Sequence, residues 1–129
     1  MTSTAGHRVT AIPANELGVG TVPVPVVSDA GLAPVEDGAL FYWFFESARA
    51  RRVPEASTIP LVIWLNGGPG SSSLLGLFSE NGPFRLTGVP GAVTTGPAPW
   101  NRSAHLLYWD QPVGTGFSPV VGDRYARTE

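Results

Sequence analysis

The sequence predicts an α/β fold in which an antiparallel hairpin precedes a strand–loop–helix–strand unit, the front part of an α/β sheet. Residues 59–65 and 105–109 are short, nearly continuous apolar runs, as is typical of strands inside a parallel sheet. Between these runs, Leu74, Leu77 and Phe78 recur at helical spacing. The alternation of strand and helix indicates the α/β class.

The first half of the chain predicts a leader and a hairpin. Residues 1–17 are mostly small and polar and are expected to be a flexible leader, whereas residues 18–129 would form the folded domain. Residues 18–27 are rich in valine but contain two prolines, which cannot donate to a ladder, so this strand is expected at an edge. Residues 28–38 contain an Asp-Gly pair typical of a hairpin connection. The aromatic run at residues 39–46 follows as a strand buried on both faces, or close to it.

The second half of the chain is divided by clusters of glycine and proline. The strand at residues 59–65 ends at one such cluster, and a short helix over residues 72–80 follows it, with serines as candidate caps. An Asn-Gly-Pro sequence ends this helix. A short strand at residues 84–86 and a Gly/Pro-rich loop at residues 87–99 lead to the strand at residues 105–109.

Composition excludes several classes of site. The 129 residues include no Cys and no Lys, and 8 arginines against 10 acids give a formal charge of −2. Without Cys there is no disulfide, thiolate nucleophile or Cys-ligated zinc, and without Lys there is neither a P-loop nor a Schiff-base lysine. The two histidines are far apart in sequence, so a His-rich metal site is not expected. The charge gives no general case for a nucleic-acid or anionic-membrane partner.

These residues contain no recognisable targeting or membrane segment. The densest apolar runs, residues 40–45 and 61–65, are far shorter than the roughly 18 continuous apolar residues of a membrane span. The N-terminal residues lack the apolar stretch of a secretory signal. We therefore expect no membrane partner and, by default, a cytoplasmic location.

The most informative stretch is the loop at residues 64–73, which follows an apolar strand and precedes the helix. Ligands of α/β proteins bind at the carboxyl ends of such strands. The adjacent glycines Gly67 and Gly68 let the backbone turn sharply and approach a ligand without a Cβ in the way. Their N–H groups, next to a helix N-terminus, would form a small anion-stabilising concavity. A carbonyl oxyanion fits this loop better than a phosphate, since no G-x-G-x-x-G or G-K-[ST] sequence follows; a tight turn without a ligand is the alternative.

Four blocks of sequence carry a family resemblance. They are residues 40–47, 60–73, 77–85 and 101–118, of which the second contains Asn-Gly-Gly-Pro-Gly-Ser-Ser and the fourth Asp-Gln-Pro-Val-Gly-Thr-Gly. In this order and at these separations, the blocks resemble the amino-terminal third of the serine carboxypeptidases, which have the α/β-hydrolase fold. The resemblance implies that residues 18–129 are a partial α/β-hydrolase domain of a serine-type carboxypeptidase, an enzyme that hydrolyses C-terminal peptide bonds.

The resemblance also implies roles for individual residues. Gly68 would supply one backbone N–H of the oxyanion hole, with Gly67 in the same loop. Asn66 and Glu80 would hold the C-terminal carboxylate of a peptide substrate, and Trp64 would belong to their hydrogen-bond network. From the residues alone, Asn66 could equally form a turn through its side chain, and Glu80 could be a solvated acid at the end of the helix. A Glu can hydrogen-bond another carboxylate only while one of the two carries a proton, so peptide binding would be favoured at acidic pH. No metal or organic cofactor is implied.

No catalytic triad is expected in these residues. The nucleophile of an α/β-hydrolase lies in a G-x-S-x-G elbow, and no serine of the chain has that frame. Asp110 is expected to be a structural turn residue, His105 a core or sheet-face residue, and His7 part of the leader. The chain is thus expected to be an amino-terminal fragment, inactive alone, whose sheet ends on an unpaired apolar edge beyond residues 105–109. The alternatives are an acyltransferase or esterase of the same fold, and a non-catalytic binding or truncated product.

Overall fold

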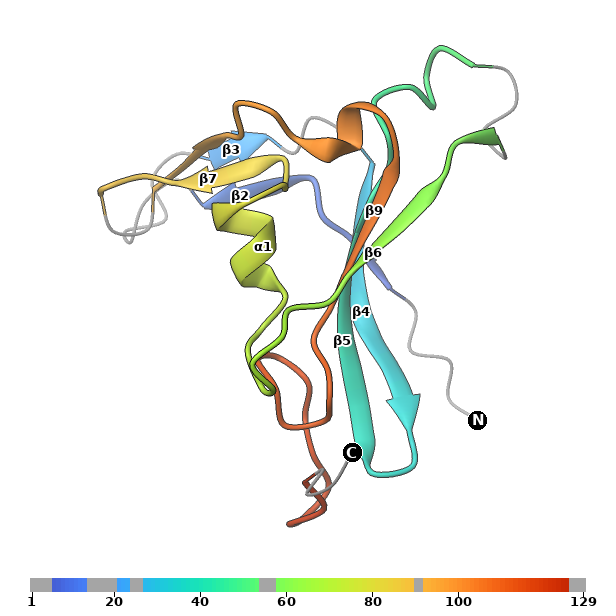
Figure 1. Ribbon diagram of the computed structural model, residues 1–129, viewed down its shortest axis with the longest axis vertical. Helices are drawn as coiled ribbons and strands as arrows, with labels where there is room; N and C mark the ends of the chain where they lie inside the picture. The colour runs from blue at the N-terminus through green and yellow to red at the C-terminus, as the bar shows by residue number, and fades with distance from the viewer. Residues whose placement is uncertain (1–5, 14–20, 24–26, 54–57, 90–91, 126–129) are drawn as a thin grey trace.

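The computed structural model describes residues 6–13, 21–23, 27–53, 58–89 and 92–125 (Figure 1). Its strands are β1 (His7–Arg8), β2 (Ala11–Pro13), β3 (Thr21–Pro23), β4 (Ser28–Val35), β5 (Gly38–Phe45), β6 (Leu61–Trp64), β7 (Phe84–Leu86), β8 (Val93–Thr95) and β9 (His105–Trp109). The helix α1 (Leu74–Ser79) follows β6, and the 3-10 helix η2 (Trp100–Arg102) precedes β9. No helix in these described ranges is long and apolar enough to cross a membrane.

The main sheet has 5 strands in the order β1-β4-β5-β9-β6. β5 pairs antiparallel with β4 on one side and with β9 on the other, and β6 runs parallel to β9 with Trp64 opposite Tyr108. α1 lies on one side of this sheet, close to β7 (Figure 1). The predicted order of hairpin, strand, loop, helix and strand is confirmed, and with it the α/β class.

The hairpin differs from the sequence prediction in its first strand. β4 occupies Ser28–Val35, the stretch predicted to be the connection, and it pairs along its whole length with β5. The turn is reduced to residues 36–37. Pro34 is tolerated because β1 pairs only with Asp29 and Ala30, which leaves β4 an edge at the proline. Pairing with the aromatic strand β5 thus decides the state of a segment whose own residues favour a turn.

The N-terminal region contains strands where the sequence predicts a flexible leader. β1 pairs with β4, and β2 pairs with β3 in a separate two-stranded sheet. Residues 7–8 and 11–13 of the expected leader therefore form strands, while residues 1–5 and 14–17 lie outside the described residues. Of the edge strand predicted over residues 18–27, β3 is the part that the structure describes as a strand.

Among the described residues, β6 is an edge strand rather than an interior one. It pairs with β9 and has no second strand partner among the described residues, whereas β9 lies between β5 and β6. The prediction of an open edge beyond residues 105–109 is therefore wrong, because the chain returns after α1 to the inner side of β6. Leu61, Ile63 and Leu65, on the face away from α1, are 52%, 53% and 54% exposed. The open apolar surface is that of β6.

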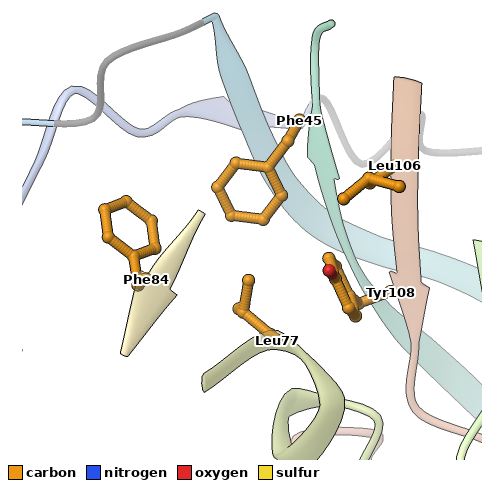
Figure 2. Close-up of a cluster of buried hydrophobic side chains, with 5 residues drawn as sticks. All are labelled: Phe45, Leu77, Phe84, Leu106 and Tyr108. Atoms are coloured by element: carbon orange, nitrogen blue, oxygen red, sulfur yellow. The ribbon is translucent and has the colours of Figure 1, made fainter. Parts of the chain in front are cut away.

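The core lies between the sheet and the layer formed by α1 and β7 (Figure 2). Its buried members are Phe45, Leu77, Phe84, Leu106 and Tyr108. The ring of Phe45 meets those of Phe84 and Tyr108 edge to face, with centroids 5.9 Å and 6.0 Å apart, an arrangement that aromatic pairs prefer. Only Phe45 of the aromatic strand β5 is fully buried, so the predicted burial on both faces is not reached here. The core packs β9 against α1, the elements that flank the site loop.

Candidate functional site

Residues 65–73 form the loop between β6 and α1. Gly68 and Gly70 have φ angles of +107° and +88°, in the left-handed region that favours glycine. Residues 67–70 are exposed, and a Cβ at Gly67 would meet nothing within 4 Å. The backbone N–H groups of Gly67 and Gly68 donate no hydrogen bond within the described part of the chain. The loop thus exposes backbone donors that have no partner among the described residues.

Ser73 anchors the start of α1 to the end of β9. Its hydroxyl accepts a hydrogen bond from the Asn66 N–H (3.1 Å) and donates one to the Trp109 carbonyl (2.6 Å). The Ser73 side chain therefore does not cap the helix, whereas the Ser72 hydroxyl accepts from the Leu74 N–H (3.2 Å). Together the two serines fix the loop at its exit into the helix.

Asp110 links this loop to the turn that follows β9. Its buried carboxylate accepts hydrogen bonds from the Ser72 hydroxyl (2.8 Å), the Ser73 N–H (2.7 Å) and the Phe117 N–H (3.0 Å). These donors occupy both carboxylate oxygens, so Asp110 is not poised to act on a substrate. Asp110 is a structural residue of the turn, as its sequence context predicts.

Trp64, the last residue of β6, orients the side chain of Asn66. The indole Nε1–H donates to Asn66 Oδ1 at 2.7 Å. Because an indole N–H can only donate, the amide oxygen must face it and the amide nitrogen points away from the indole. Both residues are half-buried. The Asn66 NH2 group, with two donor hydrogens, is therefore available to an acceptor beside the loop.

Glu80 lies directly after α1, where its N–H donates to the Gly76 carbonyl (3.0 Å). Its exposed carboxylate makes no hydrogen bond within the described residues. Burial, and to a smaller extent the negative charge of Glu80, raises the pKa of the Tyr108 hydroxyl. Tyr108 is opposite Trp64 in the sheet register. The structure therefore joins Trp64 to Asn66 and puts Glu80 near the same strand pair, but without a hydrogen bond from Glu80 to Asn66.

Two residues near the site were not assigned a role from the sequence. Gly76 lies inside α1, where a Cβ would collide with the Trp64 indole, and an isolated glycine within a helical pattern signals such a close approach. Tyr108 is fully buried, and its hydroxyl donates to Asn81 Oδ1 (2.8 Å). A tyrosine in an otherwise apolar strand indicates that its hydroxyl has a buried partner.

The histidines take no part in this site. His105 accepts a hydrogen bond from the Ser47 N–H at Nδ1 (3.1 Å), and its ring stacks on Phe44 with centroids 5.7 Å apart. His105 is thus a sheet-face residue, and His7 lies in β1. No group of three or more His, Cys, Asp or Glu residues in the described ranges could hold a metal ion.

An open cavity of about 330 Å³ lies beside β6, on the same face of the sheet as Trp64. It is lined by Val62, Ala98, Pro99, Trp100, Arg102, Ser103 and Ala104. Trp100 meets Trp64 edge to face, with ring centroids 5.8 Å apart. The cavity therefore adjoins the candidate carboxylate site through this tryptophan pair.

Comparisons with known proteins agree on one family. A model of the serine carboxypeptidase family matches residues 20–127. Carboxypeptidase S1 homolog A of Arthroderma otae is 51% identical over 78 residues, which cover 60% of this chain and 11% of the relative. Carboxypeptidase Y homolog A of Leptosphaeria maculans is 51% identical over 87 residues, 67% of this chain and 15% of the relative. Serine carboxypeptidase-like 26 of Oryza sativa is 48% identical over 99 residues, 73% of this chain and 20% of the relative.

A solved structure shows the same fold. Kex1(delta)p, a prohormone-processing carboxypeptidase from Saccharomyces cerevisiae, matches with a TM-score of 0.66 and 35% identity, over 84% of this chain and 23% of that one. The sheet is thus of the α/β-hydrolase type and the chain covers part of that fold, spanning 11% to 20% of the length of the three curated relatives. The family match extends over most of the chain, and the chain belongs to the serine carboxypeptidase family.

Proposed function

We propose that this chain supplies the oxyanion loop and the carboxylate-binding residues of a serine-type carboxypeptidase, which hydrolyses the C-terminal peptide bond of its substrate. The observation that carries the proposal is the hydrogen bond from Trp64 to Asn66 (2.7 Å). It leaves the Asn66 NH2 group beside the adjoining glycine loop, whose N–H groups have no partner among the described residues. Two sets of donors in one place suit a substrate with a free carboxylate and a reacting carbonyl close to it.

The glycine loop would stabilise the charge that develops on the carbonyl oxygen. When a serine attacks a peptide carbonyl, the oxygen becomes an oxyanion in the tetrahedral intermediate. Gly68, with Gly67 beside it, would donate a backbone N–H to this oxygen, a contribution of about 3 kcal/mol for one such donor. The hydrogen bonds of Ser73 and Asp110 hold the loop in place before substrate arrives, which keeps the donors pre-oriented.

Asn66 and Glu80 would bind the free C-terminal carboxylate, with Trp64 holding the Asn66 amide. The Asn66 NH2 group donates at any pH. A hydrogen bond between Glu80 and the substrate carboxylate needs one proton between them, so binding would strengthen as the pH falls. An esterase or acyltransferase of the same fold has no need for donors to a free carboxylate, so this arrangement favours the carboxypeptidase.

The acyl-serine steps would require a nucleophile that these residues do not include. A serine attacks the scissile carbonyl, the peptide bond breaks to release the C-terminal amino acid, and water hydrolyses the acyl-serine. No serine in the 129 residues has the G-x-S-x-G frame. The 129-residue chain by itself should therefore show no turnover of blocked dipeptides and no labelling by fluorophosphonates. Stoichiometric labelling would contradict this assignment.

Carboxylate binding by the 129-residue chain tests the proposal. N-acetylphenylalanine carries a free carboxylate, and N-acetylphenylalaninamide differs from it only there. Titration followed by the NMR signal of the Trp64 Nε1–H should show saturable binding of the acid, tighter at about pH 5 than at about pH 7, and no binding of the amide.

Two variants separate the roles of the binding residues. Asn66→Leu should abolish binding of the acid, because the NH2 donor is lost. Glu80→Gln should bind the acid with an affinity that no longer changes with pH, because a glutamine amide donates without a proton from solution. Asp123→Asn, at an exposed acid outside the site, is the control and should behave like the parent chain. Equal affinity for the acid and the amide would overturn the proposal.

A further inference from the structure

Gly76 interrupts the apolar helix α1 at the position that contacts Trp64. A Cβ at Gly76 would lie 2.7 Å from Cε2 and 2.8 Å from Cδ1 of the indole, and closer still to Nε1. Packed atoms do not approach so closely, so with a side chain at this position either the indole or the helix would have to shift. Glycine is a poor helix former, yet it stands inside a helix of only 6 residues. The close contact with Trp64 accounts for its presence.

The same residue also connects the helix to Glu80. The Gly76 carbonyl accepts hydrogen bonds from the N–H groups of Glu80 (3.0 Å) and Asn81 (3.1 Å). Asn81 in turn accepts the hydrogen bond of the buried Tyr108 hydroxyl (2.8 Å). Gly76 therefore lies between the two halves of the proposed carboxylate site, since its open Cα meets the indole that orients Asn66 and its carbonyl holds the backbone of Glu80.

Trp64 cannot move away from Gly76 without cost to the site. Its Nε1–H donates to Asn66 Oδ1 (2.7 Å), and its ring meets Trp100 with centroids 5.8 Å apart. Its backbone is held in β6 opposite Tyr108. A displaced indole would lose the hydrogen bond to Asn66, and the amide would be free to rotate its oxygen toward the substrate carboxylate. Two acceptors would then face each other.

We propose that Gly76 is a positioning residue of the carboxylate site: the missing side chain at this point of α1 lets Trp64 hold the Asn66 amide with its NH2 group toward the substrate. The inference rests on the proposed function of Asn66. Alanine forms helices more readily than glycine. A loss of carboxylate binding in Gly76→Ala therefore cannot come from weaker helix formation.

The test compares Gly76→Ala with Gly88→Ala in the 129-residue chain. Gly88 lies between β7 and β8, and a Cβ there would meet nothing within 4 Å. The readouts are the affinity for N-acetylphenylalanine and the NMR signal of the Trp64 Nε1–H, whose hydrogen exchange reports its hydrogen bond. Gly76→Ala should weaken the affinity about tenfold or more and speed exchange of the indole hydrogen, while Gly88→Ala should change neither.

Trp64→Phe distinguishes the clash between a Cβ at Gly76 and the Trp64 indole from a general loss of stability. Phenylalanine lacks the Nε1 atom and the five-membered ring that a Cβ at Gly76 would meet. Gly76→Ala should therefore lower the urea midpoint of the parent chain but have little effect on that of Trp64→Phe, while the double variant still binds the acid weakly. Equal losses of midpoint in both backgrounds would overturn the inference. If Gly76→Ala does not fold in the parent chain, folding of the double variant supports the inference and failure of both overturns it.

Failure of the proposed function would give a different result. If the parent chain does not bind N-acetylphenylalanine, the proposed function fails. Hydrogen exchange of the Trp64 Nε1–H and the urea midpoint of the double variant then decide by themselves whether Gly76 positions the indole. If Gly76→Ala binds the acid as tightly as the parent and its indole hydrogen exchanges at the same rate, the inference about Gly76 fails and the proposed function stands.

Discussion

The loop that follows β6 and the strand itself are stabilised in opposite ways. The loop exposes its glycines, yet Ser73 and Asp110 tie it to the end of β9 and to the turn beyond. The strand exposes Ile63 (53%) on an apolar face and has no second partner among the described residues. The loop is therefore held by hydrogen bonds within the described residues. The apolar face of β6, in contrast, is not buried by any other described residues.

Asp110→Ala should lower the free energy of unfolding more than the other substitutions predicted below. Asp110→Ala removes a buried carboxylate that accepts three hydrogen bonds and leaves their donors without an acceptor. We expect the free energy of unfolding to fall by about 3 kcal/mol or more, measured by urea unfolding. Asp123→Ala, at an exposed acid, should change it by less than about 0.5 kcal/mol. Similar losses in both variants would show that the carboxylate network does not stabilise the loop.

Tyr108, in the core behind the loop, should make stability fall at alkaline pH. Burial and the charge of Glu80 raise the pKa of its hydroxyl above the ordinary 10.0. Below pH 10.0 the hydroxyl is neutral in both the folded and the unfolded chain, and its stabilising contribution is complete. Above that pH the unfolded chain ionises first, so the contribution is lost progressively as the pH rises toward the folded pKa.

Tyr108→Phe should remove this alkaline loss. It should also cost about 1–2 kcal/mol at neutral pH, because Asn81 loses its hydrogen-bond donor. Urea midpoints measured between about pH 8 and about pH 11 test both effects, with Tyr125→Phe at a 52% exposed tyrosine as the control. If the parent chain and Tyr108→Phe lose stability in parallel over this range, Tyr108 is not the group responsible.

The elements that the sequence predicted correctly are those whose own residues carry a strong pattern. The aromatic run of β5 and the apolar runs of β6 and β9 are strands, and the spacing of Leu74, Leu77 and Phe78 indicates α1. β4 was missed because its Asp, Gly and Pro residues favour a turn, and only pairing with β5 makes it a strand. The sheet order was missed because β9 inserts between β5 and β6, which depends on the path of the crossover and not on a local pattern.

The candidate site likewise has features that a local sequence pattern predicts and features that depend on tertiary packing. The glycine loop was predicted from its place after a strand, a property of adjacent residues, whereas the role of Asn66 was implied by the family resemblance. Other contacts arise only when the elements pack. One is the contact between Gly76 and Trp64, and another is the hydrogen bond from the Ser73 N–H to Asp110, 37 residues further along the chain. The sequence thus indicates which loop carries the hydrogen-bond donors, and tertiary contacts determine how those donors are oriented.

The two adjacent loop glycines should differ in their tolerance of alanine. Gly68 has a φ of +107°, where a side chain is strained, whereas Gly67 is not in the positive-φ region and a Cβ there meets nothing within 4 Å. We expect Gly68→Ala to lower the free energy of unfolding by about 1–2 kcal/mol and Gly67→Ala to change it by less than about 0.5 kcal/mol. Urea unfolding of both variants provides the comparison, and equal values would mean that the loop has no fixed conformation at Gly68.

The smallest effect on folding, and the clearest on association, is expected at the exposed face of β6. Ile63→Lys should change the free energy of unfolding by less than about 0.5 kcal/mol, because the side chain is already 53% exposed. Strands with an unpaired edge and apolar side chains pair with other chains, and a lysine opposes this because its charge would have to leave water. Sedimentation velocity over a range of concentrations should show self-association weakened about tenfold relative to the parent chain.

A matched variant decides whether β6 is the associating surface. Val89 is 62% exposed and lies between β7 and β8, so Val89→Lys adds the same charge at an apolar residue outside β6. If association depends on the open strand, Val89→Lys should associate like the parent chain while Ile63→Lys stays monomeric at the same concentration. If both lysines weaken association equally, the change in net charge is responsible. The exposed face of β6 is then not the associating surface. The result for Ile63→Lys therefore has meaning only beside that for Val89→Lys.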